Sequence, residues 1–356
     1  MLRVWKFVSR DREFGSLVAT TVVVTGVLYI AVGGRMFSSL GISSMAIQIA
    51  EFGFLALGMG LAMLMGGIDL SVAAAAGLAG LMGAMVMSGS IIPITETNHM
   101  LIVTLGVVAT LGTGMLTGAI NGFLIAKVSV PPILATLGTM IFFTGVGMAV
   151  TGGNSVGIEV PEFSALFAGT KVSVFPLMFL VLVVVFAVVA FLLNKTVTGR
   201  SVYLFGENEV ALRFSGVRTE RTVMMTYLLI GLLMGFAALL IIARANSMRI
   251  GYGEGYLLQA ILVVVLAGFN PFGGKGRISS LFVGLILLQL LATSITAFGL
   301  TPYHRNLMFG LILLIVMGIN FAVNRTSRAK KLMPGVAAAP TTEAIILAER
   351  DEHIRQ

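Results

Sequence analysis

The chain has 356 residues, of which 57% are hydrophobic and 11% are charged, and its formal net charge is +8. A soluble domain usually has about a quarter charged residues, so this composition excludes a water-soluble globular protein and indicates one embedded in lipid. Because the sequence has no cysteine, disulfides and thiolate metal sites are excluded, and its three histidines lie too far apart in sequence to suggest a metal cluster.

Apolar runs long enough to cross a bilayer follow one another along almost the whole chain. A spanning helix needs about 20 mostly apolar residues. Such runs, bounded by polar, Gly or Pro residues, predict helices at 15–33, 42–66, 70–90, 101–126, 132–151, 174–193, 223–243, 256–270, 278–298 and 305–323. The sequence therefore predicts an all-α polytopic membrane protein with about ten transmembrane helices.

Lys and Arg are distributed unevenly between the two sides of this arrangement. Most of the 23 basic residues fall at the termini and in the loops of one side, whereas the other side has Arg35, Lys171, Arg244, Arg249 and Arg305. Because cytoplasmic loops are enriched in Lys and Arg, both termini are predicted to be cytoplasmic, and the net charge needs no nucleic acid to explain it. The expected parts are a cytoplasmic segment 1–14, a transmembrane domain 15–323 with a cytoplasmic loop at about 194–222, and a cytoplasmic tail 324–356.

Polar side chains inside the apolar runs are candidates for contacts with a transported solute. Gln48 and Glu51 lie three apart on one helix face, and Gln289, Thr293 and Thr296 recur at positions i, i+4 and i+7 of a later helix. The alternative is that these side chains only bond neighbouring helices, which is worth about 0.6 kcal/mol per bond in membranes. Both interpretations stay open at this point.

The segment GGIDLS at 66–71 interrupts what would otherwise be one long apolar stretch. A carboxylate at membrane depth costs about 3 kcal/mol, so Asp69 is expected to face protein or water. In the simpler interpretation Asp69 and Ser71 cap the helix that follows, and the glycine pair forms the turn. Capping does not exclude a place beside a transport path, and Asp69 is therefore a candidate path residue.

The helix predicted at 101–126 combines glycines with one amide side chain. Gly114, Gly118 and Gly122 recur every four residues, a spacing that lets helix backbones approach closely in lipid and predicts a tightly packed bundle. Asn121 lies beside them and is predicted to bond another helix rather than a ligand, although it also stays among the path candidates.

The long loop at 194–222 contains a short amphipathic segment. Residues 207–215 are predicted to form a helix with Val210, Leu212 and Phe214 among mixed charges, and Gly216 is predicted to end it. Exposed apolar residues on a short cytoplasmic helix need a partner to cover them. The alternative is a solvated connector lying on the membrane surface.

Three segments together resemble the permeases of ribose-type sugar ABC importers. They are GGIDLS at 66–71, INGFLIAK followed after three residues by PPILATLGTM at 120–140, and GENEVALRFSGV at 206–217. The likeness extends in order from about Phe14 to Val323. It implies a bacterial inner-membrane subunit that pairs with a second permease copy, identical or related, binds two cytoplasmic ATP-binding subunits and receives solute from a periplasmic solute-binding protein.

In that family the cytoplasmic loop matches a coupling element of the pattern E-x-A-x4-G. Glu209, Ala211 and Gly216 reproduce the pattern here. By this resemblance, the residues expected to couple the chain to the ATPase are Glu207, Glu209, Ala211, Leu212, Arg213, Phe214 and Gly216.

The turn GFNPFGGKGR at 268–277 departs from the plain glycine-rich turn of many such permeases. It also fails as a phosphate-binding loop of the form G-x4-G-K-[ST], because Gly273 is followed by Gly274 and Lys275 is followed by Gly276. ATP is therefore expected to be used by the partner ATPase. This chain is expected to be a transport subunit rather than an enzyme, with no cofactor or metal of its own.

Two other classes of function compete with this interpretation. An ion-coupled secondary transporter would use carboxylate or histidine relays inside the membrane, for which Glu51 and Asp69 are the carboxylates in or near the predicted helices. An intramembrane enzyme is less compatible, because the sequence has no HExxH motif and no paired carboxylates in its apolar runs. The sequence leaves the solute open among pentoses, hexoses, a sugar-like signalling molecule and nucleosides.

Overall fold

The structure, a computed structural model, describes residues 12–34, 36–95, 97–172, 174–301, 303–316 and 318. The chain divides into two compact units, Met1–Phe309 and Gly310–Gln356. In the second unit the described residues 310–316 belong to a helix that begins at Tyr303 and ends at Val316. The predicted tail 324–356 and most of the segment 1–14 lie outside the described residues.

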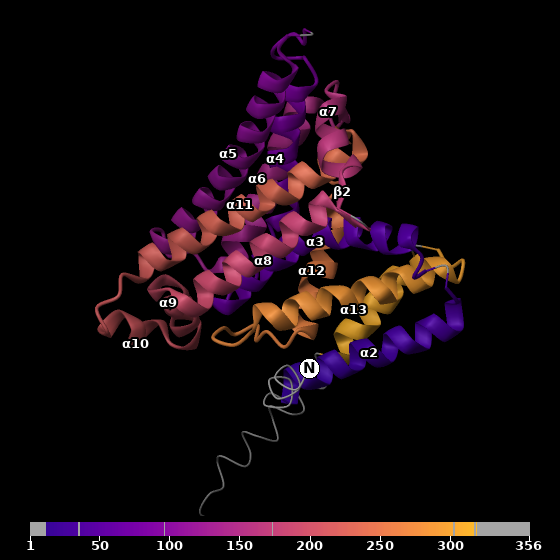
Figure 1. Cartoon of the computed structure of the whole chain (residues 1–356). Helices are drawn as coiled ribbons and strands as arrows, with labels where there is room; N and C mark the ends of the chain where they lie inside the picture. The colour runs from indigo at the N-terminus through magenta and orange to yellow at the C-terminus, as the bar shows by residue number, and fades with distance from the viewer. Residues whose placement is uncertain are drawn as a thin grey trace, which may run out of the picture. The chain divides into compact units, whose positions relative to one another are not determined.

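Long helices follow the predicted apolar runs closely (Figure 1). They are α2 (Arg12–Val32), α3 (Ser39–Leu64), α4 (Val72–Met87), α5 (His99–Ala126), α6 (Pro132–Thr151), α8 (Leu177–Lys195), α11 (Thr219–Ala245), α12 (Glu254–Leu266) and α13 (Ile278–Ala297). Within the described ranges, seven helices are long and apolar enough to cross a membrane, and α4, α12 and Tyr303–Val316 are shorter apolar helices beside them. The predicted all-α polytopic fold is confirmed, whereas the cytoplasmic position of the termini stays a prediction.

The core of the first unit is built around α3, α4 and α11. The apolar part of α3 is almost entirely buried, and α11 packs against α5, α3 and α4. Glycines allow α5 and α11 to approach closely: a methyl group on Gly118 would lie 2.2 Å from the Tyr227 carbonyl oxygen, and one on Gly231 would lie 2.2 Å from that of Gly114. The close helix packing predicted from the glycine spacing in α5 is therefore confirmed, because these glycines bring the backbones of α5 and α11 into direct contact.

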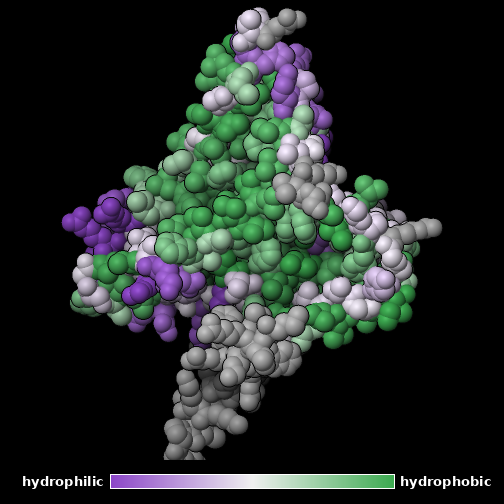
Figure 2. Space-filling view, in the orientation of Figure 1, coloured by the Kyte–Doolittle hydropathy of each residue, from purple (hydrophilic) through white to green (hydrophobic). Residues whose placement is uncertain are grey.

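Apolar side chains also cover the flanks of the bundle. Figure 2 shows a largely hydrophobic surface over α5, α8 and α11, with hydrophilic residues gathered near the ends of these helices. Large apolar side chains such as Leu116, Leu134 and Phe191 are exposed on α5, α6 and α8. A surface of this extent is stable where lipid covers it.

One end of the unit carries short elements that the sequence did not predict. They are β1 (Val156–Gly157), α7 (Pro161–Ser164), the π-helix η1 (Ala165–Gly169), β2 (Lys171–Val172), β3 (Phe175–Pro176) and β4 (Ser247–Met248). Val156 is paired with Met248 in the antiparallel β1–β4 ladder, and Val172 with Phe175 in β2–β3. His99 Nδ1 lies 3.0 Å from Glu162 Oε1, and the Glu162 backbone N–H, followed by His99, lowers the pKa of this carboxyl.

The other end of the unit carries α9 (Val197–Glu207) and α10 (Glu209–Phe214). The turns at 65–71 and 268–277 lie at this end too, since Gly66 approaches the Phe272 carbonyl and Gly274 N donates to Leu64 O. We call it the coupling-loop end. The Lys127 ammonium and the Glu220 carboxylate are 2.5 Å apart there and join the end of α5 to the first turn of α11.

Candidate solute path and coupling surface

Asp69 lies in the turn between α3 and α4 and is buried. Gly66 has φ +77°, a left-handed conformation that glycine adopts without steric cost. Asp69 Oδ1 accepts hydrogen bonds from Ser71 N at 2.8 Å and Ser71 Oγ at 2.6 Å. Ser71 occupies the N-cap position of α4, but its side chain makes no capping bond. The expected cap by Ser71 is therefore wrong, because its hydroxyl hydrogen goes to Asp69, which orders the turn instead.

Asn121 connects this turn to two further helices. Its Nδ2 donates to Ser71 Oγ at 2.7 Å, and its Oδ1 accepts from Thr139 Oγ1 at 2.6 Å. Thr136, one turn earlier on α6, accepts a hydrogen bond from Leu70 N at 3.1 Å. The interhelical bonds predicted for Asn121 are thus present, and a place for Asn121 or Asp69 in a solute path stays a prediction.

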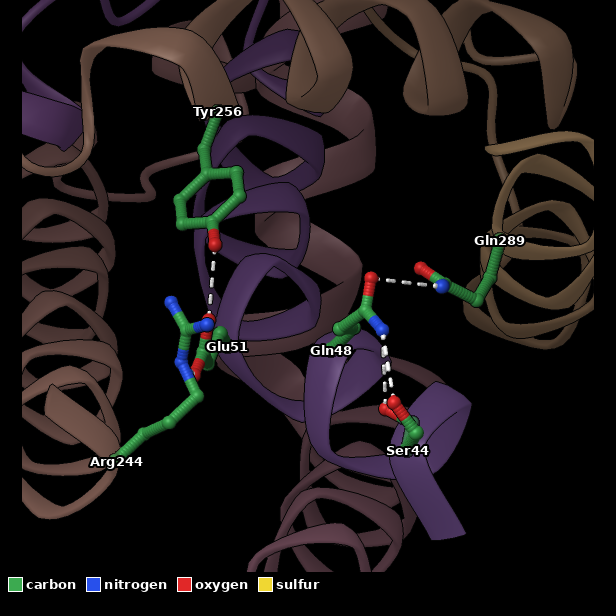
Figure 3. A network of polar contacts seen from close by, with 6 residues as sticks. All are labelled: Ser44, Gln48, Glu51, Arg244, Tyr256 and Gln289. Atoms are coloured by element: carbon green, nitrogen blue, oxygen red, sulfur yellow. Dashed lines mark hydrogen bonds and ion pairs between the residues drawn. The ribbon is translucent and has the colours of Figure 1, made fainter. Parts of the chain in front are cut away.

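Glu51 is the centre of a second polar group, far from this turn along α3. Its side chain is 0% exposed, and Oε1 is paired with the Arg244 guanidinium. Oε2 accepts a hydrogen bond from the Tyr256 hydroxyl at 2.8 Å. Figure 3 shows these side chains converging from α3, α11 and α12. A buried carboxylate in lipid surroundings requires such partners, because its desolvation would otherwise be uncompensated.

Gln48 lies one turn before Glu51 and meets α13. Gln289 Nε2 lies 3.2 Å from Gln48 Oε1 and 2.9 Å from Thr293 Oγ1. Gln48 Nε2 lies 3.2 Å from the hydroxyl of the exposed Ser44 (Figure 3). The structure thus joins two polar stripes that the sequence placed separately. Thr296 is not part of this group, since its hydroxyl bonds only Ala292 O of its own helix, at 3.5 Å.

The two polar groups on α3 form one face that becomes more exposed toward the helix N-terminus. Glu51 is buried, Gln48 is half-buried and Ser44 is exposed. Amides, a hydroxyl and a paired carboxylate offer donors and acceptors of the kind that bind the hydroxyls of a polar solute. The face is also remote from the coupling-loop end, because Arg244 is 25 residues beyond the start of α11, about 37 Å along a helix.

Arg244, Tyr256 and Ser44 were not predicted as members of this site. The sequence provides only indirect evidence for Arg244. A carboxylate in an apolar helix is expected to pair with a cation, and Arg244 is one of the basic residues predicted on the same side of the membrane. Choosing among them requires knowing which helices are neighbours, and the sequence alone does not give this. Among the residues that the structure describes, no group of three or more His, Asp or Glu side chains is placed to hold a metal ion.

At the coupling-loop end the predicted short helix is present but begins two residues later than expected. Asn208 separates α9 from α10 and caps α10, its Oδ1 accepting from Ala211 N at 2.9 Å. After Phe214 the chain turns at Gly216, which has φ +79° with open space around it, so the predicted stop is confirmed. The predicted coupling residues that α10 and its flanks expose are Glu207, Glu209, Ala211, Arg213, Phe214 and Gly216.

Leu212 behaves differently from the other predicted coupling residues. Its side chain is only 3% exposed, whereas Phe214, two residues further, is 88% exposed. A side chain buried within this chain cannot fill a groove on a partner. The expected contact of Leu212 with an ATPase is therefore wrong, and Leu212 instead anchors α10 to the bundle while Phe214 and Val210 project from it.

Comparison with known proteins gives a family and several relatives. A family model described as branched-chain amino acid transport system / permease component matches residues 41–317. The chain is 31% identical to the ribose import permease protein RbsC of Escherichia coli K12 over 309 residues, which is 86% of this chain and 92% of that protein. It is 33% identical to RbsC of Bacillus subtilis 168 over 280 residues, covering 78% of this chain and 84% of that protein.

A third relative is the L-arabinose transport system permease protein AraH of Escherichia coli K12. It is 31% identical over 295 residues, 82% of this chain and 87% of that protein. No solved structure matches the chain.

Proposed function

The chain belongs to the family of branched-chain amino acid transport system permease components, and we propose that it is the membrane-spanning permease subunit of an ABC importer for a sugar or sugar-like solute. The observation that carries this proposal is the likeness to ribose and arabinose permeases over about four fifths or more of the chain. Although the family description mentions branched-chain amino acids, these relatives are named for pentoses, so a sugar is the preferred solute.

The polar face of α3 supports a polyhydroxylated solute. Gln48, Gln289 and Thr293 present amide and hydroxyl groups, which can exchange their mutual hydrogen bonds for bonds to sugar hydroxyls. The aromatic ring of Tyr256 lies beside Glu51 on the same face, and sugar sites commonly combine such a ring with polar groups. We assign these residues to the path, with Asp69 and Asn121 closer to the coupling-loop end.

The exposed part of α10 supports ATP-driven rather than ion-driven transport. Phe214 and Val210 project from a short helix that Leu212 fastens to the bundle, which is the arrangement expected of an element that enters a groove on a partner. The two carboxylates that an ion-coupled transporter would need are already engaged, Glu51 with Arg244 and Asp69 with Ser71. The partners of this importer are two cytoplasmic ATPase subunits, a second permease subunit and a periplasmic solute-binding protein in the inner membrane of a bacterium.

The test is retention of an ATPase by Phe214→Ala. Burying a Phe ring is worth about 1.5–3 kcal/mol, so its loss should weaken the complex by about tenfold or more. The tagged permease is extracted in mild detergent, and ATP hydrolysis by the copurified subunits is measured together with ATP-driven uptake of labelled ribose or arabinose in cells. Phe214→Ala should reach normal membrane abundance but lose both signals.

Phe298→Ala is the matched control, since Phe298 is also an exposed aromatic residue but follows α13 at the opposite end of the unit. It should behave as the unsubstituted chain. Leu212→Ala should instead lower the stability of the permease, because it removes a buried side chain. Wild-type ATPase retention and uptake by Phe214→Ala, or sodium- or proton-driven uptake by the purified chain alone, would contradict the proposal.

A further inference from the structure

The turn between α12 and α13 holds its own shape and displays one aromatic ring. Asn270 N donates to Lys275 O at 3.0 Å and Gly273 N donates to Asn270 O at 2.9 Å. The Asn270 side chain adds bonds to Gly273 O at 3.1 Å and from Phe272 N at 3.2 Å. At the tip of this ordered turn Phe272 is 85% exposed, so the described part of the chain leaves its aromatic ring uncovered.

The same turn is seated on the end of α9. A methyl group on Gly206 would lie 2.5 Å from Gly274 N and 1.9 Å from Leu64 O, and one on Gly273 would lie 2.5 Å from Gly206 O. The Tyr203 hydroxyl donates to Gly276 O at 3.1 Å. In Figure 1 the loop that leads into α13 extends to the foot of α9, next to α10. The Phe272 turn and the α9–α10 segment thus form one continuous surface.

The composition of this combined surface indicates the kind of partner it fits. Phe214 and Phe272 are its most exposed aromatic side chains, and exposed charges from Glu209, Arg213 and Lys275 surround them. Aromatic anchors with a charged rim are typical of protein interfaces, in which a few such residues supply most of the binding energy. A lipid-facing surface of this protein looks different, because the flanks of α5, α6 and α8 expose apolar residues almost without charges.

We propose that the Phe272 turn is a second contact for the ATPase subunit that binds α10, with Phe272 inserted into that subunit beside the site of Phe214. This inference rests on the proposed function, since it assumes that α10 docks an ATPase. It goes further by assigning part of the docking surface to a segment about 60 residues away in the sequence, outside the coupling loop. The turn is in main-chain contact with Gly206 at the end of α9, and only Asn208 separates α9 from α10. Because the turn adjoins the segment that leads directly into α10, we assign it to the same ATPase subunit.

Photo-crosslinking tests the contact directly. The photo-reactive residue p-benzoylphenylalanine is placed singly at positions 214, 272 and 298 of the full chain, and each variant is irradiated in membranes that contain the copurifying ATPase. Positions 214 and 272 should both form a permease–ATPase adduct, and position 298 should form none. An adduct at 214 without one at 272 would overturn the second contact and leave the importer assignment intact.

If neither 214 nor 272 forms an adduct, the proposed function fails and the second contact fails with it. Crosslinks from 272 to lipid alone would show that the ring lies in the membrane interface, which also overturns the inference. Phe272→Ala supplies an independent measurement: the ATPase should bind about tenfold more weakly, while the melting temperature of the permease alone stays unchanged, because the ring is already exposed. Phe272→Trp should restore the affinity, whereas Phe298→Ala should leave it unaltered.

Discussion

The ion pair between Glu51 and Arg244 gives a quantitative test of the polar face, because its two partners differ in exposure. Glu51 is 0% exposed and Arg244 is 48% exposed. Replacing Arg244 by Met leaves a buried carboxylate with only the Tyr256 hydroxyl as partner. Removing one member of a buried pair costs about 3–5 kcal/mol, and partial solvent screening of Arg244 favours the lower end, about 3 kcal/mol.

Replacing Glu51 by Gln should cost much less. The Gln side chain still accepts the Tyr256 hydrogen bond, and the freed guanidinium can be hydrated, so the expected cost is about 1 kcal/mol. In Arg244→Met combined with Glu51→Gln no buried charge remains, so the double variant should recover about 2 kcal/mol relative to the sum of the single variants.

Equilibrium unfolding in mixed micelles, followed by far-UV circular dichroism, measures all of these free energies. Arg249→Met is the matched control. Arg249 is exposed and its guanidinium carbon lies 5.5 Å from the Tyr252 ring centroid, an interaction worth about 0.5 kcal/mol at such a site. If Arg244→Met costs no more than Glu51→Gln or Arg249→Met, the argument that Glu51 depends on this cation is refuted.

Three further outcomes are expected. Since the chain has no native Cys, Ser155→Cys should react with an impermeant thiol reagent from outside intact cells and Ser215→Cys should not; the reverse labelling would overturn the orientation. Asp69→Asn keeps the oxygen that accepts from Ser71, so membrane abundance and uptake should persist, and lost uptake at normal abundance would show that the charge itself is needed. Gly118→Ala should destabilise the protein by about 1–3 kcal/mol in the same unfolding assay because of the contact with α11, whereas Gly112→Ala, with open space around it, should be neutral or slightly stabilising.

Features that depend on one helix at a time were predictable from the sequence. Apolar runs placed the helices to within a few residues, as with 132–151 predicted and Pro132–Thr151 observed. Gly216 ends α10 as expected, because the left-handed conformation is a local property of glycine. The spacing of Gly114 and Gly118 predicted close packing, although the helix that receives them, α11, could not be named in advance.

Features that depend on three or more segments escaped prediction. The partners of Glu51 come from α11 and α12, and no local pattern marks Arg244 or Tyr256 as neighbours of α3. Leu212 and Phe214 look equivalent in the sequence, because both are apolar residues on one short helix, and only the packing of α10 against the bundle separates the buried side chain from the exposed one. The β1–β4 pair was missed for a different reason, since strands of two residues are too short to leave a pattern in the sequence.

The main-chain contacts that join Gly206, Gly273 and Leu64 also have a mechanical consequence. Where two segments touch only through side chains, a change of rotamer can accommodate a small displacement of one segment. Backbone carbonyl and amide groups in direct contact have no such freedom. We therefore expect a shift of the end of α9 to displace the end of α3 with it. Because α3 is one uninterrupted helix, roughly 20 Å long from Leu64 to Glu51, we expect the polar face near its N-terminal half to shift together with Leu64.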